Sequence, residues 1–557
     1  MSDLHFNSWP RNLPHDISVP ATSLWHNLDV STKRFPQRAA LVFYDRVITY
    51  AELFQQVEFL AGFLQKECGV KRGDRVALDM QNSPQFVIAF YAILRADAMV
   101  VPVNPMNLTA ELEHMADDSG AKVAIIAQEV VPQFVPLLDK GKIERAVVAC
   151  YSDFIPPATD LKVPEIIGAT RKEFPGDDLV LWSDAIERKI TPAPHLANAD
   201  DLCVMPYTSG TTGHPKGCVH KHRSVMFNVL SVPQWYHMVT DECILAVLPF
   251  FHVTGMQNSM NTPLYLGSTV VILPRWDREV AAQLIARYRV NRWTVVPTML
   301  VDFLASPNID KHDLSTLYGI GGGGAAMPEA VAQELERRRG IQFVEGYGLS
   351  ETMAPTHINP ELNPKKQCLG IPIFNTESRI VDPDSLKELP PGEVGEIIVR
   401  GPQVFEGYWN KPEANAQCFV EVDGKKFFRT GDLARMDSDG YYFLVDRLKR
   451  MINASGFKVW PAEVEALFYK HPAIQEAVVI AKKDEKRGET VKVMVVLRDA
   501  YKGKVAEQDI IDWARANMAA YKVPRFVGFL DVMPRSGTGK IQWRALQEKE
   551  NQEVASR

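Results

Sequence analysis

Short apolar runs alternate with helical segments along most of the chain, and this alternation constrains the fold more than any other feature of the sequence. Six brief apolar runs bounded by turn residues are typical of sheet strands: 99–103, 123–127, 245–248, 270–273, 293–296 and 397–400. Helical patterns lie between such runs; Ser83 and Pro84, for example, cap and start a helix that we expect to end near Ala96. The sequence therefore predicts an α/β fold with parallel-rich sheets.

The pattern changes after Asp446, where charged turns and short elements replace the earlier alternation. The elements expected there are helices over 461–468 and 509–519, strands over 477–481 and 491–497, and a polar turn over 484–489. A chain of 557 residues exceeds what one hydrophobic core usually supports. We therefore expect a large domain over 1–445, a hinge over 446–450 and a small α+β domain over 451–557.

The overall charge and the cysteines indicate which cellular compartment and which classes of binding partner to expect. A formal net charge of −6 spread over 557 residues argues against a dedicated nucleic-acid surface. The seven cysteines are scattered and no two form a Cys-x-x-Cys pair, which is typical of a reducing compartment without structural disulfides. The longest apolar stretch, 86–103, contains Arg95 and Asp97 and so cannot be a simple membrane span. We expect a cytoplasmic protein with no integral membrane segment.

The segment 207–217 combines hydroxyl groups, glycines and a lysine directly after a strand-like run, which favours a phosphate-binding loop. Its expected anion-binding residues are Thr208, Ser209, Gly210, Thr211, Thr212, Gly213 and Lys216. Glycines let backbone N–H groups approach an anion closely, and the lysine adds positive charge. The segment is not a Walker A motif, because Gly217 follows the lysine and Pro215 removes a donor. A plain Ser/Thr/Gly turn is the alternative, since linkers share this composition.

Further motifs follow the phosphate-binding loop along the chain. They occupy 321–326, 345–352, 429–432, 446–449, 455–459 and 534–540. In this order, together with 207–217 and the Tyr-Lys-Val-Pro stretch 521–524, they resemble the acyl-CoA synthetases of the adenylate-forming ligase superfamily. The resemblance covers nearly the whole chain. It implies a large N-terminal adenylate-forming domain of α/β subdomains and a small, mobile α+β C-terminal domain.

The resemblance also implies an activity that uses ATP, Mg²⁺ and coenzyme A. Such an enzyme is an ATP-dependent carboxylic acid:CoA ligase, in which a carboxylate attacks the α-phosphate of ATP and the thiol of coenzyme A then displaces AMP from the acyl-adenylate. The first step brings two anions together, so catalysis depends on positioning and on cations that neutralise the developing charge. The expected partners are therefore small molecules, and a homodimer is left open.

Several motif residues take nucleotide-binding roles by resemblance. Glu351 is the expected Mg²⁺ ligand because hard divalent cations prefer carboxylate oxygens, and Thr208 would lie close to the same ion. Tyr347 would stack on adenine, Glu345 would lie near the exocyclic amine, and Ser350 would donate to the α-phosphate. The expected nucleotide-binding residues outside the loop are Gly324, Ala325, Glu345, Gly346, Tyr347, Gly348, Ser350, Asp432, Arg447 and Lys540. Many relatives have Gln or Asn in place of Glu345 and Thr in place of Ser350.

The C-terminal motifs imply a catalytic lysine and a hinge. Lys540 follows a Ser-Gly-Thr-Gly run and would stabilise the negative charge of the adenylation transition state, with Lys216 and Glu351 as further catalytic residues. Lys449 is the expected pivot of the small domain between the two half-reactions. The expected CoA-binding residues are Ser455, Gly456 and Phe457. The surroundings of Lys540 also resemble the segment that protein acetyltransferases modify in bacterial relatives.

The identity of the acid is the least defined part of the expected activity. The residues expected to border the acyl pocket are Phe251, His252, Gly255 and Met256. Their apolar surroundings favour a medium- or long-chain fatty acid, with aryl and dicarboxylic acids as alternatives on the same scaffold. Two other classes stay open: an adenylating enzyme with another acceptor, and a nucleotide-binding protein that has lost catalysis. The presence of both Lys540 and Glu351 argues against such a loss.

Overall fold

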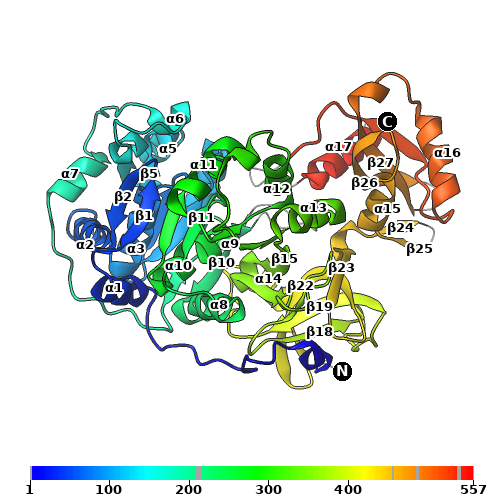
Figure 1. Ribbon diagram of the computed structural model, residues 1–557, viewed down its shortest axis with the longest axis horizontal. Coiled ribbons are helices and arrows are strands. Elements are labelled where there is room, and N and C mark those ends of the chain that lie inside the picture. Colours follow the sequence, from blue (N-terminus) through cyan, green and yellow to red (C-terminus); the bar gives the residue numbers. More distant parts are fainter. Residues whose placement is uncertain are drawn as a thin grey trace. The chain divides into compact units, whose positions relative to one another are not determined.

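Contacts between residues divide the chain into two compact units (Figure 1). The computed structural model describes residues 3–208, 215–324, 327–454, 457–484, 488–535 and 541–555. The large unit comprises Met1–Ser378, Val399–Phe428 and Asp439–Tyr441, and the small unit comprises Arg379–Ile398, Arg429–Ser438 and Tyr442–Arg557. The chain therefore passes between the units more than once, and the hinge over 446–450 stays a prediction.

The first sheet of the large unit is built mainly from parallel strands. Its order is β17 (Ile371–Pro372), β16 (Ala354–Ile358), β15 (Val344–Leu349), β14 (Gly319–Gly323), β13 (Arg292–Thr294), β11 (Cys243–Ala246), β12 (Thr269–Ile272), β1 (Ala39–Phe43) and β2 (Arg46–Thr49). The strands from β15 to β1 pair in parallel. Antiparallel pairing adds β2 at one end and β16 and β17 at the other.

The second sheet of the large unit has a parallel centre and an antiparallel end. Its order is β20 (Gly407–Tyr408), β10 (Lys216–Lys221), β8 (Leu202–Val204), β4 (Met99–Val103), β3 (Arg75–Asp79), β5 (Val123–Ala127), β6 (Arg145–Ala149) and β7 (Leu179–Leu181), with β9 (Tyr207–Thr208) paired to β10. All residues of β4 and β5 are buried. Parallel strands covered on both faces have this apolar character, which confirms the α/β prediction.

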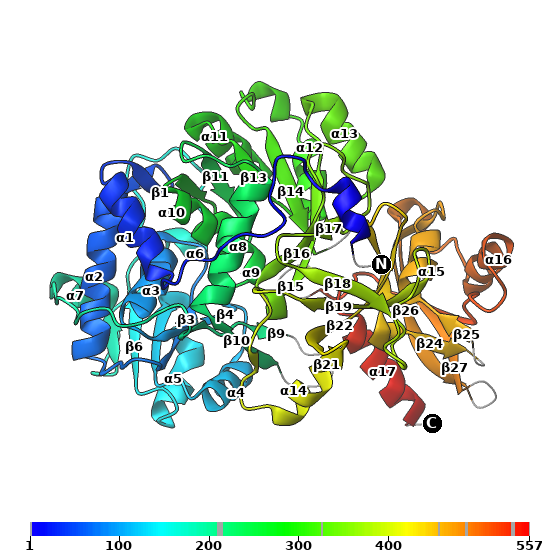
Figure 2. The same ribbon diagram turned by 90° about the horizontal axis from the view of Figure 1, so that it is seen from below.

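Helices surround these two sheets. They are α1 (Trp25–Arg34), α2 (Tyr50–Lys66), α3 (Pro84–Arg95), α4 (Thr109–Ser119), α5 (Val131–Asp139), α6 (Glu165–Gly168), α7 (Trp182–Glu187), α8 (His222–Trp235), α9 (Val253–Gly255), the π-helical η4 (Met256–Asn261), α10 (Thr262–Leu266), α11 (Arg278–Tyr288), α12 (Pro297–Leu304), α13 (Glu329–Arg339) and α14 (Pro412–Cys418). Short 3₁₀ turns are η1 (Leu4–Ser8), η2 (Gln128–Val130), η3 (Tyr151–Phe154), η5 (Ile309–Lys311) and η6 (Ser350–Thr352). Helices α1, α2 and α3 pack side by side (Figure 2), and apolar residues of α3 share one buried core with β11 and β12.

The remaining elements form two smaller sheets and their helices. One sheet has the order β18 (Glu377–Val381), β19 (Val394–Arg400), β22 (Lys425–Met436) and β21 (Phe419–Val422), with β23 (Tyr442–Arg447) paired to β22. The other has the order β25 (Phe457–Val459), β24 (Ile452–Ala454), β27 (Gly488–Leu497) and β26 (Ile474–Asp484), with β28 (Phe526–Phe529) paired to β27. The accompanying helices are η7 (Leu448–Arg450), α15 (Pro461–Phe468), η8 (Asp499–Tyr501), α16 (Glu507–Asn517) and α17 (Trp543–Ala555). Apolar residues of β26, β27, α15 and α16 form one core, as a small α+β fold requires.

One expected turn is shorter than the sequence indicates. The polar residues at 484–489 suggest a turn, but β26 continues to Asp484 and β27 begins at Gly488, which lie opposite each other. Lys483 also lies opposite Glu489. Opposite charges stabilise such a cross-strand pair, and the backbone ladder itself needs no apolar side chain. The polar composition was therefore a poor guide to where these strands end.

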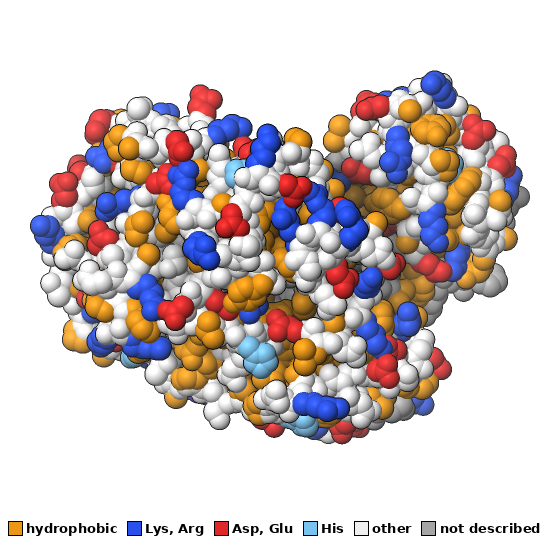
Figure 3. Space-filling model, viewed as in Figure 1, with side chains coloured by type: hydrophobic (Ala, Val, Ile, Leu, Met, Phe, Trp, Pro, Cys, Tyr) orange, Lys and Arg blue, Asp and Glu red, His pale blue; other side chains and the backbone are white. Residues whose placement is uncertain are grey.

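Charged side chains of both signs are interspersed over the face shown in Figure 3, as the small net charge of −6 leads one to expect. All seven cysteines are free thiols. Within the described ranges, no helix has both the length and the apolar composition that a membrane crossing demands.

Candidate active site

Lys216 and Glu351 both contact one tyrosine, Tyr408, in the large unit. Strands β9 and β10 pair antiparallel, so that Thr208 lies opposite Lys216. The Nζ atom of Lys216 lies 5.0 Å from the centre of the Tyr408 ring. The Tyr408 hydroxyl donates a 2.8 Å hydrogen bond to Oε1 of Glu351. The structure thus brings together residues that the sequence places in separate motifs.

Tyr408 belongs to this cluster although no sequence motif indicates it. It lies on β20, opposite Cys218 of β10, and the N–H of Trp409 donates to the Gly217 carbonyl oxygen at 2.8 Å. Burial is the main cause that raises the pKa of the Tyr408 hydroxyl, and the negative charge of Glu351 raises it further. The hydroxyl therefore stays protonated and can donate its hydrogen bond to Glu351. Only the non-local pairing of β20 with β10 brings this residue to the site.

The groups around Glu351 fit a magnesium ion. Carboxylate and hydroxyl oxygens are hard ligands, and Mg²⁺ in proteins is usually held by one or two carboxylates together with substrate phosphates. Glu351 offers the carboxylate, and Thr208, whose side chain carries a hydroxyl, lies opposite Lys216 on the paired strand. The N–H of Phe405 donates to the Glu351 carbonyl oxygen at 2.9 Å, which ties η6 to the segment that precedes β20.

Glycines on β14 and β15 let neighbouring main chain pack directly against these strands. A Cβ atom added at Gly322 would fall on the Val295 carbonyl oxygen, and one added at Gly348 would fall on the Ala354 carbonyl oxygen. Gly324 follows β14 with a φ of 84°, a conformation that other residues rarely adopt. Close packing of neighbouring main chain therefore requires glycine at Gly322 and Gly348. Gly346, also expected at the nucleotide, lies on the same strand as Gly348.

Glu345 and Tyr347, both expected at adenine, are buried on β15. The two carboxylate oxygens of Glu345 accept hydrogen bonds from the Met327 and Cys368 N–H groups, each at 2.7 Å. Burial raises the pKa of this carboxyl group. The Tyr347 ring packs edge-on against His357, with ring centres 5.7 Å apart. Glu345 thus braces two neighbouring segments, a contact set that the sequence did not predict.

A buried histidine holds Ser350 in place. Nε2 of His220 donates to the Ser350 carbonyl oxygen at 2.7 Å, and its Nδ1 lies 3.4 Å from the Ser224 hydroxyl. Burial lowers the pKa of His220 to about 4, so the ring is neutral near neutral pH and carries its proton on Nε2. His220 therefore positions the segment that carries Glu351.

The residues expected to border the acyl pocket lie between β11 and α10. His252 precedes α9, and its Nδ1 accepts a 3.4 Å hydrogen bond from the Thr254 N–H. Met256 begins η4 and is fully buried, whereas Phe251 is half-buried. A Cβ atom at Gly255 would fall on main-chain oxygens of the preceding turn.

Asn82 fixes that preceding turn from the other sheet. Its Nδ2 donates to the Leu248 carbonyl oxygen at 2.9 Å, and its Oδ1 accepts from the Phe250 N–H at 2.7 Å. The side chain is buried. Both hydrogen bonds lock the turn that precedes Phe251 and His252, and no motif in the sequence pointed to this contact.

Asp432 and Arg447, expected at the nucleotide, belong to the small unit. They lie opposite each other on β22 and β23, and Nε of Arg447 is 3.0 Å from Oδ1 of Asp432. The side chain of Asp432 is 3% exposed and that of Arg447 is 47% exposed. The arginine therefore orients a buried carboxylate, and the expected contacts of both residues with the nucleotide stay predictions.

Other predicted site residues lie outside the part of the chain that the structure describes. They are Ser209, Gly210, Thr211, Thr212, Gly213, Ala325, Ser455, Gly456 and Lys540. The backbone of Lys449 lies in η7, and that of Phe457 begins β25. The functional roles of all these residues stay predictions.

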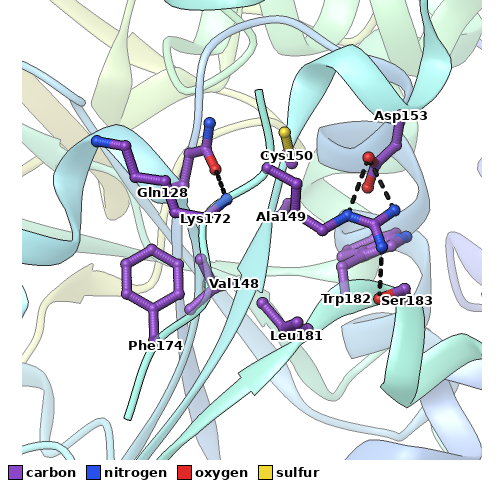
Figure 4. Close-up of a pocket in the computed structure, with 11 residues that line it drawn as sticks. Gln128, Val148, Ala149, Cys150, Asp153, Lys172, Phe174, Leu181, Trp182 and Ser183 are labelled. Atoms are coloured by element: carbon purple, nitrogen blue, oxygen red, sulfur yellow. Dashed lines mark hydrogen bonds and ion pairs between the residues drawn. The ribbon is translucent and has the colours of Figure 1, made fainter. Parts of the chain in front are cut away.

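A separate shallow hollow lies near the carboxyl ends of β5 and β6 (Figure 4). Arg171, which lines it, lies 2.9 Å from Asp153 and donates to the Ser183 hydroxyl at 3.3 Å. Oε1 of Gln128 accepts from the Lys172 N–H at 3.1 Å. Because these polar groups bind one another, the hollow is best explained by packing between a loop and the sheet.

Comparisons with known proteins identify the family. Residues 28–409 match the AMP-binding enzyme family, and residues 463–540 match the AMP-binding enzyme C-terminal domain. The long-chain-fatty-acid–CoA ligase of Bacillus subtilis (strain 168) is 34% identical over 556 residues, which cover 98% of this chain and 97% of that protein. The feruloyl-CoA synthase of Amycolatopsis sp is 34% identical over 508 residues, which cover 91% and 94%.

A solved structure shares the fold at similar length. ATP-bound MatB from Rhodopseudomonas palustris matches with a TM-score of 0.82 and 26% identity, over 95% of this chain and 99% of that chain. The family match spans most of the large unit, and the second match lies wholly in the small unit. The chain is thus a member of the AMP-binding enzyme family, with both of that family's domains.

Proposed function

We propose that the protein is an ATP-dependent carboxylic acid:CoA ligase. The observation that supports this most directly is the cluster of Lys216 and Glu351 at Tyr408, with Thr208 opposite Lys216 on the paired strand. A nucleoside triphosphate with its metal ion needs hydrogen-bond donors and positive charge at the phosphates and a carboxylate for the cation. The cluster offers these groups together, and the names of the curated relatives support the same reaction class.

In the first half-reaction, an oxygen of the substrate carboxylate forms a bond to the α-phosphorus of ATP, and the bond from that phosphorus to the departing pyrophosphate breaks. Lys216 would neutralise charge on the phosphates, and Lys540 would neutralise charge that develops in the transition state. Thr208 and Glu351 would hold Mg²⁺, which supplies further positive charge when bound. Tyr408 keeps the Glu351 carboxylate oriented through its hydrogen bond.

In the second half-reaction, the sulfur of coenzyme A forms a bond to the acyl carbon, the bond from that carbon to the AMP oxygen breaks, and the thiol proton is released to solvent. Ser455, Gly456 and Phe457 would contact the CoA arm. Asp432 would accept hydrogen bonds from the ribose hydroxyls, as a carboxylate can do with both oxygens. Its ion pair with Arg447 supports that orientation.

The substrate that fits best is a medium- or long-chain fatty acid. Met256 and its apolar neighbours Phe250, Val253 and Met260 are buried next to the half-buried Phe251, and such surroundings suit an alkyl chain. The name of the Bacillus subtilis relative supports this class. An aryl acid is the second candidate, because the feruloyl-CoA synthase is equally identical over a shorter stretch.

A panel of acids tests this proposal. In the presence of ATP and Mg²⁺, the enzyme should release pyrophosphate faster with octanoate, palmitate or oleate than with ferulate, benzoate or malonate. Acyl-CoA should form only when coenzyme A is added. The Glu351→Gln variant keeps the side-chain shape but loses the charge, and should slow pyrophosphate release by about 10²-fold or more. A rate of pyrophosphate release that is the same with and without a carboxylic acid would overturn the ligase assignment. Faster pyrophosphate release with ferulate than with the fatty acids would show that the substrate is an aryl acid and not a fatty acid.

Regulation through Lys540 is a further part of the proposal. Acetylation by a protein acetyltransferase would remove the positive charge and most of the donors of this lysine. Adenylation should therefore stop after treatment with the acetyltransferase and acetyl-CoA, and return after deacetylation. Mass spectrometry together with the pyrophosphate assay checks this. An unmodified Lys540, or full activity of the acetylated protein, would contradict it.

We also propose the cytoplasm as the compartment in which the enzyme acts. Its seven cysteines are free thiols, and five of them are buried. Reducing compartments keep thiols in this state.

A further inference from the structure

Helix α4 contacts the chain on both sides of the β9–β10 pair. His114 and Asp118 lie four residues apart on this helix and therefore share one face. Nε2 of His114 lies 3.1 Å from the Pro215 carbonyl oxygen, just before β10. The Tyr207 hydroxyl, from β9, donates to Oδ2 of Asp118 at 2.9 Å. One helix face thus holds the strand pair that carries Thr208 and Lys216.

The second oxygen of the Asp118 carboxylate binds another segment. Nζ of Lys411 lies 2.5 Å from Oδ1 of Asp118, and the Lys411 N–H donates to the Tyr408 carbonyl oxygen at 3.3 Å. The side chain of Asp118 is only 6% exposed, so its charge depends on these donors rather than on water. A single buried carboxylate therefore joins β9 to the turn that follows Tyr408.

Both joined segments carry groups of the candidate active site. Tyr207 directly precedes Thr208 on β9, and Tyr408 contacts Lys216 through its ring and Glu351 through its hydroxyl. If either segment moved relative to the other, the placement of Lys216 against Glu351 would change. Catalysis that relies on positioning is sensitive to such a change, since a misplacement of about 1 Å can cost about 10²-fold in rate.

We propose that Asp118 is a positioning residue for the ATP-dependent step. It acts through Tyr207 and Lys411, which fix the β9–β10 pair against Tyr408, and so sets where Lys216 and Glu351 meet the nucleotide. The inference rests on the proposed ligase function and adds to it a residue outside the motifs that carry the resemblance. It predicts a defect that is specific for ATP.

Asp117 provides a matched control one residue earlier on α4. Its Oδ2 lies 2.6 Å from Nζ of Lys142, and its side chain is 57% exposed. Adjacent residues on a helix point to different sides, so Asp117 does not share the face of Asp118. An exposed ion pair of this kind contributes little to stability. The Asp117→Asn variant therefore removes the same charge from the same helix and leaves the Tyr207 and Lys411 contacts in place.

The experiment compares Asp118→Asn, Asp117→Asn and Tyr207→Phe with the unaltered enzyme. For Asp118→Asn, kcat/KM for ATP should fall about 10- to 100-fold, while KM for the fatty acid should stay within about twofold because the acyl segment is not touched. Asp117→Asn should match the unaltered enzyme. Tyr207→Phe removes one of the two joined contacts without removing the charge and should give a smaller ATP-specific loss. Combining it with Asp118→Asn should add less than the sum of the two effects.

Each outcome bears on a different claim. An unchanged kcat/KM for ATP in Asp118→Asn, or a rise in KM for the fatty acid as large as the rise in KM for ATP, would overturn the positioning role. If Asp118→Asn unfolds, Tyr207→Phe decides, and an ATP response identical to that of the unaltered enzyme would overturn the role as well. Failure of the unaltered enzyme to exchange pyrophosphate with ATP in the presence of any acid would instead count against the ligase function.

Discussion

Replacing Lys540 by alanine is expected to slow acyl-adenylate formation by about two orders of magnitude or more, comparable to the loss of one preorganised donor in a transition state. The ammonium group is proposed to meet the charge that develops at the α-phosphate as pyrophosphate leaves. No pyrophosphate leaves in the second half-reaction, so thioester formation from supplied acyl-adenylate should suffer much less. Single-turnover pyrophosphate release and acyl-CoA formation from synthetic acyl-adenylate measure the two steps separately.

Lys549 offers the control for this substitution. It is an exposed lysine on α17, close to Lys540 in the sequence. The Lys549→Ala variant removes the same kind of charge and should leave both half-reactions unchanged. Equal losses of both half-reactions in Lys540→Ala would show that the lysine supports something other than adenylation.

Proline in place of Lys449 is expected to slow the second half-reaction and spare the first, which is the reverse of the effect expected for Lys540→Ala. The proposed catalytic lysine and the proposed CoA-binding residues 455–457 belong to the same expected small domain, and we expect each step to need its own docking pose of that domain. A few residues at the junction must then absorb a change of φ and ψ. Proline fixes its own φ near about −65° and restricts the preceding residue. Pyrophosphate release in a single turnover should stay largely intact, whereas acyl-CoA formation should slow by about 10²-fold.

The Lys449→Ala variant is the matched control, because it removes the same side chain and keeps the backbone free to rotate. It should form acyl-CoA at close to the unaltered rate. Thermal unfolding of both variants verifies that η7, the turn that contains this residue, tolerates the change. A folded Lys449→Pro enzyme that makes thioester at the unaltered rate would place the pivot elsewhere.

Features that depend on neighbouring residues could be predicted from the sequence. Helix α3 begins at Pro84 as expected, because the Ser83 hydroxyl accepts a hydrogen bond from the Phe86 N–H at 3.1 Å. The strands β4 and β5 and the helix α15 have the predicted bounds. Their signals are short apolar runs or a proline at a helix start, which need no knowledge of the rest of the chain.

The supports of the candidate site could not be predicted, because their partners lie far apart in the chain. Tyr408 reaches Glu351 across 57 residues, and Lys411 reaches Asp118 across 293 residues. Their residue types are ordinary, and no local pattern marks them. Glu345 is an intermediate case: the motif predicts its place, but only the fold shows that main-chain donors occupy both of its oxygens.

The glycine-rich strands β14 and β15 also limit how this sequence can evolve. The main chain of Val295 and Ala354 fills the space that even a methyl group would need at Gly322 and Gly348. Selection should remove mutations at these positions whichever acid the enzyme uses. Adaptation to a new acid is expected to begin instead at side chains that are only partly buried, such as Phe251. The glycine positions of β14 and β15 thus cannot change, whereas side chains at the expected acyl pocket can. The acid specificity of the enzyme can therefore diverge without a change in its use of ATP.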